Sequence, residues 1–294
     1  MRRRLWPLLL GLSYTVVIRL MGGLRWDHVL IGALPCLDFY NPRTRKFLAC
    51  FFPFILTGVL YDSMRYYYWP GISGHIHIAE PYYRDLRYFG INDGGNRFTA
   101  NEFFARHPKV WLDLMCGFAY LVFVGEYFCA AFYLFFRERW VALRTCALSF
   151  LIVNLLGFIT YYIYPAAPPW YVTRYGVLGP PRMDVHSSAA ATTRFDRILG
   201  THFFEHIYAH GVDVYGAYPS LHVSYPLLTF LIVRTQPELK WLLAPAFAFY
   251  LLMCLSAMYL QHHYVVDVLM GTGYAIATWI VTRRFLLTGE KSSR

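Results

Sequence analysis

Apolar residues in this chain come in long blocks, and this arrangement restricts the folds that it can adopt. Hydrophobic residues make up 57% of the 294 residues and charged residues only 15%, a balance that soluble domains of this size seldom have. A helix that crosses the hydrocarbon layer needs roughly 20 mainly apolar residues. Six blocks approach or exceed that length: 46–62, 111–136, 142–164, 219–233, 241–260 and 264–282. The sequence therefore predicts an all-α integral membrane protein, a polytopic helical bundle with six core transmembrane helices.

A weaker pair of apolar stretches, 5–22 and 27–40, precedes these six blocks. The three arginines at positions 2–4 resemble the start of a secretory signal peptide, but no small-residue cleavage site follows them. We therefore expect a retained hydrophobic hairpin or anchor over residues 1–45 and the main membrane domain over residues 46–294. If the N-terminal pair also crosses the bilayer, the chain has eight spans.

The formal charge of +10 is distributed unevenly along the chain. Basic residues gather at the termini and in short connections beside the apolar blocks, where the positive-inside rule has most force. Two long polar segments, 63–110 and 165–218, alternate with those connections. We therefore expect cytoplasmic termini, with both long segments on the non-cytoplasmic (periplasmic or luminal) face. Because the basic residues follow the membrane topology, they do not indicate a nucleic-acid partner.

The two long polar segments are too aromatic for plain linkers, and they predict short helices at the membrane interface. Residues 193–210 look like one amphipathic helix, whose expected apolar side carries Phe195, Ile198, Leu199, Phe203 and Ile207. Within it His202, His206 and His210 recur every four residues, a spacing that could align zinc ligands on one face. A solvated stripe facing lipid headgroups is the simpler interpretation. We expect neither a metal site nor a cofactor.

Two short histidine motifs stand about forty residues apart near the C-terminus: YPSLH at 218–222 and YLQHHYVVD at 259–267. Each opens an apolar block, and the two crossings between them return the chain to the same membrane face. On a helix, His263 and Asp267 would lie one turn apart on one side, whereas His262 would point elsewhere. A carboxylate in that place can fix the tautomer of an imidazole and stabilise its charged form. The spacing therefore favours His263 over His262 as a reactive group.

These motifs resemble two signatures of the type 2 phosphatidic acid phosphatase superfamily, Pro-Ser-Gly-His and Ser-Arg-x5-His-x3-Asp. The residues that match them are Pro219, Ser220 and His222 in the first signature and Ser256, His263 and Asp267 in the second. Two positions depart from the pattern, since Leu221 replaces the glycine and Ala257 replaces the arginine. The superfamily's remaining, lysine-containing signature has no basic counterpart, and PAAPPWY at 165–171 stands in its place.

That PAAPPWY segment, the PSLH motif and MYLQHHYVVD at 258–267 resemble, in this order, the catalytic subunits of fungal inositol phosphorylceramide synthases. The resemblance implies that residues 46–294 form a phosphatidic acid phosphatase-like catalytic membrane domain. It also implies the reaction: transfer of a phosphoinositol-type headgroup from a phospholipid to a lipid alcohol such as ceramide. The expected partners are thus a phospholipid donor and a lipid acceptor.

The resemblance assigns roles to individual residues as well. His263 would attack the phosphorus and become a phosphohistidine, Asp267 would orient it, and His222 would act first as an acid and then as a base. The residues expected to contact the substrate are Pro168, Pro169, Trp170, Tyr171, Ser220, His262 and Arg65.

The missing lysine and arginines require another source of positive charge for the phosphate. The N-terminus of the helix that begins near Ser220 could hold an anion. Arg65 or Arg174 could also supply the charge, although Arg65 could equally form a salt bridge with Asp62.

Two other functions compete with headgroup transfer. A lipid phosphatase would let water attack the phosphohistidine of a phosphatidate-like or polyprenyl phosphate or diphosphate substrate. The scarcity of cations favours the transferase, because a dianionic monoester needs more positive charge than a monoanionic diester. A transporter or scaffold would place ionisable residues in mid-membrane, whereas the candidates here gather at one face.

Overall fold

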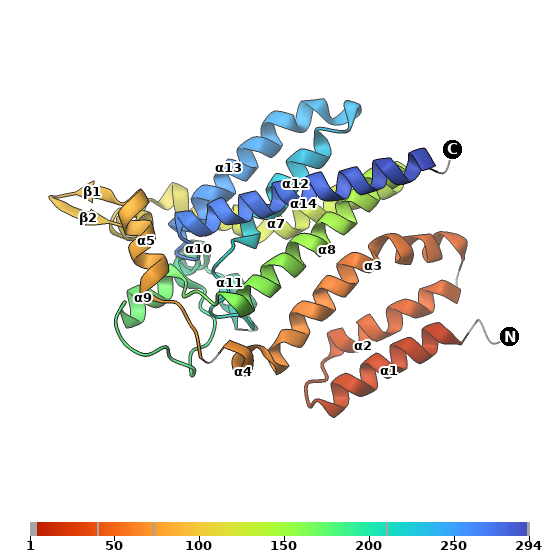
Figure 1. Cartoon of the computed structure of the whole chain (residues 1–294), viewed down its shortest axis with the longest axis horizontal. Helices are drawn as coiled ribbons and strands as arrows, with labels where there is room; N and C mark the ends of the chain where they lie inside the picture. The colour runs from red at the N-terminus through yellow and green to blue at the C-terminus, as the bar shows by residue number, and fades with distance from the viewer. Residues whose placement is uncertain (1–4, 40, 73, 210, 293–294) are drawn as a thin grey trace. The chain divides into compact units, whose positions relative to one another are not determined.

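The computed structural model of the chain describes residues 5–39, 41–72, 74–209 and 211–292. Helices form nearly all of the regular structure in these residues, together with one short β-hairpin (Figure 1). The predicted all-α class is therefore confirmed. The chain divides into two compact units, Met1–Leu60 and Tyr61–Arg294.

The first unit holds two short helices and most of a longer one: α1 (Trp6–Leu20), α2 (Trp26–Ala33), the 3-10 helix η2 (Leu34–Phe39) and α3 (Pro42–Ser63). Glycines let α1 and α2 approach closely, because a Cβ on Gly11 would lie 1.9 Å from the carbonyl oxygen of Gly32. Such small-residue crossings are common between membrane helices. The second apolar stretch is divided into two pieces: Pro35 cannot continue α2, and the chain goes on as η2.

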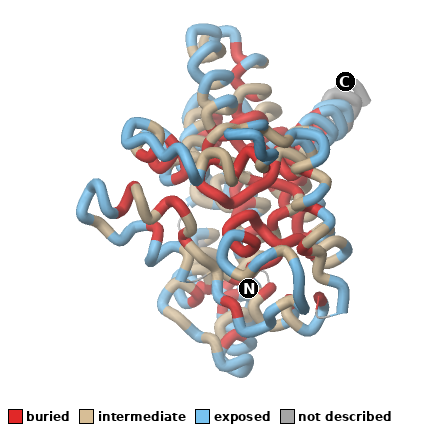
Figure 2. Tube along the Cα trace, turned by 90° about the vertical axis from the view of Figure 1, so that its left-hand side faces the viewer, coloured by how far each residue is buried: buried red, intermediate tan, exposed pale blue. Residues whose placement is uncertain are grey.

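The second unit is built around α12 (Leu221–Val233). Its other long helices are α7 (Val110–Phe136), α8 (Trp140–Ile163), α13 (Leu243–Tyr259), which follows the 3-10 helix η5 (Pro237–Leu242), and α14 (Val265–Ser292). All four long helices pack against α12. Most residues of α12 are buried, and buried segments are drawn in red in Figure 2. Burial on all sides explains why α12 is apolar around its whole circumference.

Five helices in the described residues are long and apolar enough to cross a membrane: Pro42–Tyr66, Val110–Phe136, Trp140–Ile163, Pro237–Tyr259 and Val265–Arg284. They coincide with five of the six predicted core spans, so the prediction of a polytopic membrane protein is confirmed. The sixth block corresponds to α12, whose 13 residues extend only about 20 Å. The helix α1 is likewise a shorter apolar helix.

Residues 61–109 form the short elements expected at the membrane interface. They are η3 (Met64–Tyr66), α4 (Tyr68–Ile72), α5 (Ala79–Phe89), β1 (Ile91–Asp93), β2 (Asn96–Phe98) and α6 (Ala100–Arg106). The helix α5 packs against α14, and α6 packs against α13. The hairpin β1–β2 is an addition to the predicted fold. Its turn contains Gly94 and Gly95 with φ of 57° and 81°, the positive values that a tight two-residue hairpin turn needs.

Residues 165–220 contain a second set of short helices: α9 (Pro169–Tyr175), η4 (Ala190–Thr192), α10 (Thr193–Leu199) and α11 (Phe203–Tyr208). The prediction of one helix over 193–210 is wrong, because Gly200 adopts a left-handed conformation and ends α10. The Asp196 carboxylate then accepts the Phe204 N–H at 2.9 Å and starts α11. The expected apolar side is also wrong. Phe195 and Phe204 are buried, whereas four of the five predicted positions are exposed: Ile198, Leu199, Phe203 and Ile207.

Candidate active site

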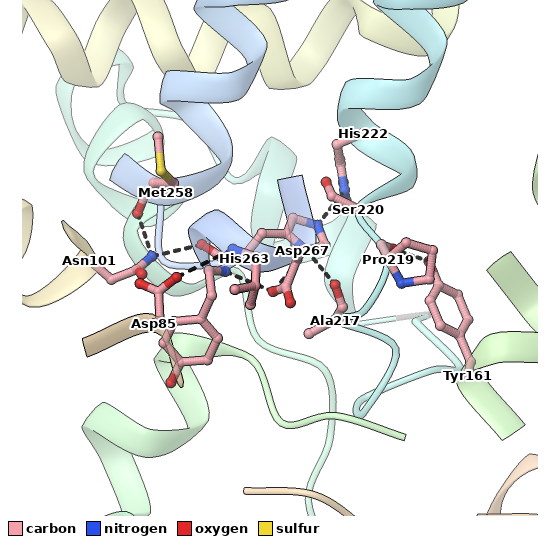
Figure 3. A network of polar contacts seen from close by, with 12 residues as sticks. Asp85, Asn101, Tyr161, Ala217, Pro219, Ser220, His222, Met258, His263 and Asp267 are labelled. Carbon is pink, nitrogen blue, oxygen red and sulfur yellow. Dashed lines mark hydrogen bonds and ion pairs between the residues drawn. The ribbon is translucent and has the colours of Figure 1, made fainter. Parts of the chain in front are cut away.

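The two histidine motifs meet where α12 and α14 begin. His222 lies in the first turn of α12, and His263 lies in the turn that joins α13 to α14. Their ring atoms Nδ1 of His222 and Nε2 of His263 are 2.9 Å apart (Figure 3). Residues 41 positions apart in sequence therefore form one hydrogen-bonded pair.

A backbone carbonyl fixes the protonation pattern of this pair. The Nδ1 atom of His263 lies 2.8 Å from the carbonyl oxygen of Ala217. A carbonyl can only accept a hydrogen bond, so the neutral ring of His263 carries its proton on Nδ1 and a lone pair on Nε2. His222 must then donate its Nδ1–H to that lone pair. Nε2 of His263 is thus the ring nitrogen of the pair that carries a lone pair toward the other histidine.

Asp267 lies near His263, but the two residues do not share one helix as the spacing suggests. The spacing argument places both residues on one helix, but α14 begins only at Val265. The Asp267 carboxylate accepts the Tyr264 N–H at 2.7 Å and so caps its own helix. Its Oδ2 atom is 3.8 Å from Nδ1 of His263, close enough for electrostatic attraction but too far for a hydrogen bond.

Two distant segments hold the loop that contains Ala217 through their backbones. Isolated parallel β-bridges join His77 to Ala166 and Ala166 to Gly216. Within them, the N–H of Ala166 donates to the Tyr215 carbonyl at 2.7 Å. The start of the PAAPPWY segment thereby fixes the loop that orients His263.

The rest of the PAAPPWY segment supports the histidine turn. Pro168 caps α9 and Pro169 opens it, a position that suits a residue without an N–H. The Trp170 N–H donates to the Gln261 carbonyl at 3.0 Å. Trp170 and Tyr171 are both buried, and the Tyr171 hydroxyl accepts the backbone N–H of Arg182.

Asn101 and Gln261 fix the backbone of the histidine turn through their side-chain amides. The Asn101 side-chain amide donates to the carbonyls of Met258 and His263, at 2.8 and 2.9 Å. Gln261 has φ of 69°, a left-handed conformation that ends α13, and its side chain donates to the Asn101 carbonyl at 2.6 Å. Figure 3 shows His263 between Asn101 and Ala217. The nucleophile candidate is therefore held by backbone and amide contacts on both sides.

Asp85 closes the N-terminus of α14 from another helix. It lies on α5, is fully buried, and its Oδ1 accepts the Val266 N–H at 3.3 Å. Burial raises the pKa of Asp85 to about 7. Its other oxygen has no hydrogen-bond partner among the described residues.

The starts of α12 and α14 touch directly at Ser220. Its N–H donates to the Asp267 carbonyl at 3.0 Å. A Cβ on Gly271 would lie 2.1 Å from the Ser220 carbonyl oxygen, so only glycine permits this approach. The Ser220 hydroxyl is buried, makes no capping bond to α12, and has no partner within the described part of the chain. It therefore stays available for the anion-binding role predicted for this helix start.

His262 belongs to an aromatic stack next to the pair. Its ring stacks on Tyr208, with centroids 4.7 Å apart and an angle of 8°, and on Tyr120 at 5.3 Å. Tyr120 also stacks on His222 at 4.6 Å. Burial lowers the pKa of His262 to about 3, so this ring is neutral at physiological pH. A neutral, stacked ring suits packing or substrate contact better than proton transfer.

The remaining predicted contact residues lie further from the pair. Arg65 forms a salt bridge with Asp62, the structural alternative for this residue. The guanidinium of Arg174 stacks over Tyr175 at 5.4 Å. Pro169 lines a cavity of about 390 Å³ together with Asn101 and Tyr264, and neither His222 nor His263 lines it.

The histidine stripe of the second polar segment offers little to a metal. His202 pairs with Glu205 at 2.6 Å, and His210 lies outside the described residues. In the part of the chain that the structure describes, no group of three His, Cys, Asp or Glu residues could hold a metal ion.

Sequence reasoning missed Asp85, Asn101 and the tyrosines of the stack. Asp85 had a detectable signal, since it falls four residues after Pro81 on the buried side of an amphipathic helix, where a charge is costly. Asn101 directly follows Thr99 and Ala100 at the start of a capping box, a pattern that predicts a helix start but no contact. Nothing in the sequence pattern points to the Ala217 carbonyl.

Comparison with known proteins agrees with this geometry. A family model described as the PAP2 superfamily matches residues 96–281, which include both histidine motifs. The phosphoinositol dihydroceramide synthase of Bacteroides thetaiotaomicron is 34% identical over 261 residues, covering 88% of this chain and 84% of that protein. No solved structure matches the chain at a significant level.

Fungal relatives match a shorter part. The inositol phosphorylceramide synthase catalytic subunit of Saccharomyces cerevisiae is 33% identical over 177 residues, and that of Schizosaccharomyces pombe is 29% identical over 178 residues. The alignments cover 59% and 60% of this chain but only 43% and 41% of the fungal proteins. The predicted enzyme class, a phosphotransferase, and the predicted relationship are both confirmed by these matches. The chain belongs to the PAP2 superfamily.

Proposed function

We propose that this protein transfers a phosphoinositol-type headgroup from a phospholipid to a ceramide-like lipid alcohol through a phosphohistidine on His263. One observation carries the proposal: Nε2 of His263 presents a lone pair 2.9 Å from Nδ1 of His222. A nucleophile and a proton-transfer group are thus adjacent. The relatives named as phosphoinositol dihydroceramide and inositol phosphorylceramide synthases support the choice of donor and acceptor.

In the first half-reaction, Nε2 of His263 attacks the phosphorus of the donor diester. The bond between phosphorus and the diacylglycerol oxygen breaks, and that oxygen takes a proton from the imidazolium form of His222. The anionic diester beside His222 stabilises this charged form. The phosphorylated His263 ring is itself positively charged, and the Ala217 carbonyl and the Asp267 carboxylate, 2.8 and 3.8 Å from Nδ1, stabilise it.

In the second half-reaction, the hydroxyl of the lipid alcohol gives its proton to His222. Its oxygen then bonds to phosphorus, and the bond between phosphorus and Nε2 of His263 breaks. The products are the new phosphodiester and the starting pair of histidines. General acid and base catalysis of this kind typically contributes about 10²–10⁴-fold to the rate.

Several arginines of the two polar segments are paired with carboxylates, which favours a diester over a phosphomonoester. Arg65 is paired with Asp62, Arg84 with Glu80 and Arg194 with Asp113. Asp267 itself is buried directly beside His263. A monoanionic diester tolerates such surroundings better than a dianion, because it needs less neutralising charge.

We also propose that the site faces the non-cytoplasmic side and that both termini are cytoplasmic. The connections at the opposite ends of the site helices carry basic residues, with Arg137 and Arg139 after α7 and Arg234 after α12. The positive-inside rule puts such ends in the cytoplasm. In intact cells, a membrane-impermeant thiol reagent should label Gly95→Cys in the β1–β2 turn. Labelling only after permeabilisation would reverse the orientation.

Purified protein with headgroup-labelled phosphatidylinositol, with and without ceramide, tests the reaction. We expect labelled sphingolipid only when ceramide is present, and no product from His263→Ala. The exposed His107 serves as the matched control, since His107→Ala should retain wild-type activity. Free inositol phosphate formed regardless of ceramide would instead indicate a hydrolase. Full activity of His263→Ala would contradict the proposed phosphohistidine.

A further inference from the structure

Asp213 is a carboxylate beside the histidine pair that the proposed mechanism does not use. It lies in the loop between α11 and α12, four residues before Ala217, whose carbonyl orients His263. The Gly216 N–H donates to the Asp213 carbonyl at 3.0 Å, so this loop forms a tight turn. The Asp213 carboxylate is near enough to His263 for the two to interact electrostatically.

One phenol hydroxyl contacts this carboxylate, and other tyrosines lie near it. The Tyr61 hydroxyl donates to Oδ1 of Asp213 at 2.9 Å. Five further tyrosines from α4, α8, α11 and α12 lie within electrostatic range of it: Tyr68, Tyr161, Tyr162, Tyr208 and Tyr225. Burial raises the pKa of Asp213 to about 6, so the group is mostly ionised at neutral pH. An ionised carboxylate has about four acceptor positions, and Tyr61 uses one of them.

Accessibility separates Asp213 from the buried part of the site. His263 and Asp267 are 4% and 0% exposed, and Ser220 is fully buried. By contrast, Asp213, His222 and Tyr208 are only half-buried. These three side chains thus keep an exposure that His263, Asp267 and Ser220 lack.

We infer that Asp213 binds the hydroxyl groups of the polyol headgroup on the donor lipid and thereby selects the headgroup that is transferred. This inference rests on the proposed function, because it assigns the recognition element of the same site. A polyol supplies several O–H donors, and an ionised carboxylate is acceptor-only, so the two are complementary. The carboxylate also repels a second negative charge, which disfavours phosphomonoesters at this position.

The orientation of the phenols favours a polyol over an amine headgroup. Aromatic cages for quaternary ammonium groups present ring faces to the cation. Tyr61 instead presents its hydroxyl to Asp213, and the Tyr208 ring face is occupied by His262. Hydroxyl edges around a carboxylate extend a hydrogen-bond network, which is the environment that a hydroxyl-rich ring requires.

A donor comparison in mixed micelles tests the inference. Asp213→Asn should lower kcat/KM for phosphatidylinositol by about 10- to 100-fold, the usual loss for a hydrogen bond to a charged group. Phosphatidylethanol is also a monoanionic diester but has no headgroup hydroxyls, so its slower transfer should change less than about threefold. The control is Asp184→Asn, which removes an exposed carboxylate and should leave both donors unaffected. An equal loss with both donors, or no loss with either, would overturn the inference.

Two further measurements keep the outcomes separate. Free glycerophosphoinositol, a monoanionic diester that carries the same polyol, should inhibit the wild type, and Asp213→Asn should weaken this inhibition about tenfold or more. If the wild type makes no product from phosphatidylinositol, the proposed function fails, while binding of glycerophosphoinositol still decides the role of Asp213. Tyr61→Phe keeps the carboxylate and removes its phenol donor, so it should give a smaller, donor-selective loss. If Asp213→Asn does not fold, an unselective Tyr61→Phe counts against the inference.

Discussion

The two sides of the candidate site hold their polar groups in different ways. On the histidine side, the Ala217 carbonyl and the Asn101 amide contact His263. Backbone bridges from two further segments support the loop that contains Ala217. On the other side, the Asp213 side chain accepts one hydrogen bond from a tyrosine side chain, Tyr61, and stays half-buried. The group proposed to make and break bonds is thus held by the fold itself, whereas the group proposed to recognise the headgroup is held by side chains.

This difference separates chemistry from selectivity. A shift of about 1 Å in a reacting group can cost roughly 100-fold in rate, so backbone support suits His263. A side chain that binds a headgroup can be replaced without moving the backbone. We therefore expect substitutions that remove or displace the histidines to reduce turnover whatever headgroup the donor carries, and those around Asp213 to change the preference among headgroups.

After His263, we expect replacement of His222 to cause the largest loss of turnover. His222→Gln removes the proton donor for the diacylglycerol oxygen, and transfer from phosphatidylinositol should fall by about 10²–10⁴-fold. A donor with a nitrophenol leaving group needs no proton on departure, so formation of the phosphoenzyme from it should be much less affected. Single-turnover assays with both donors measure this. A similar loss with both leaving groups would assign His222 a binding role instead, and the exposed His202 provides a control through His202→Ala.

Substitution of Gly271 tests the backbone frame without changing any ionisable group. Its Cβ would lie 2.1 Å from the Ser220 carbonyl oxygen, so Gly271→Ala must push the start of α12 away from α14. We expect roughly a 10- to 100-fold loss of transfer from misplacement of the pair, together with a destabilisation of about 1–3 kcal/mol. The loss should be the same for phosphatidylinositol and phosphatidylethanol.

The neighbouring glycine provides a matched control for this change. A Cβ on Gly273 meets nothing within 4 Å, so Gly273→Ala on the same helix should keep wild-type turnover and thermal stability. If the two variants behave alike, contact between the starts of α12 and α14 does not hold the pair together.

The fold was predictable as far as it depends on apolar length. Blocks of the right length gave five of the long helices, because burial in lipid requires a minimum number of apolar residues. The break at Gly200 was harder to foresee. The Asp196 carboxylate starts α11 by accepting a backbone N–H, and such a contact leaves no periodic pattern in the sequence.

The site was predictable only where side chains carry it. The motifs pointed to His222, His263 and Asp267, and the structure brings these three together. The spacing argument nevertheless relied on a helix that starts two residues after His263. The Ala217 carbonyl is a backbone group in a loop, and Asp85 and Asn101 act across tertiary contacts, so no local pattern indicates their partners.

Asp85 offers the smallest and most specific test of the histidine side, a change in pH dependence with little change in turnover. Its pKa is raised from the usual 3.8 to about 7, so between these values the folded protein binds one proton more than the unfolded chain. By linkage, this group makes the free energy of unfolding fall as pH rises from about 4 to about 7. Asp85→Asn should flatten that slope, as measured by thermal unfolding in detergent at pH 5 and pH 8. Asp184→Asn, which changes an exposed carboxylate, should retain the slope. An unchanged slope in Asp85→Asn would mean that Asp85 is fully ionised at neutral pH. The N-terminus of α14 would then be capped by a carboxylate and not by a neutral carboxylic acid.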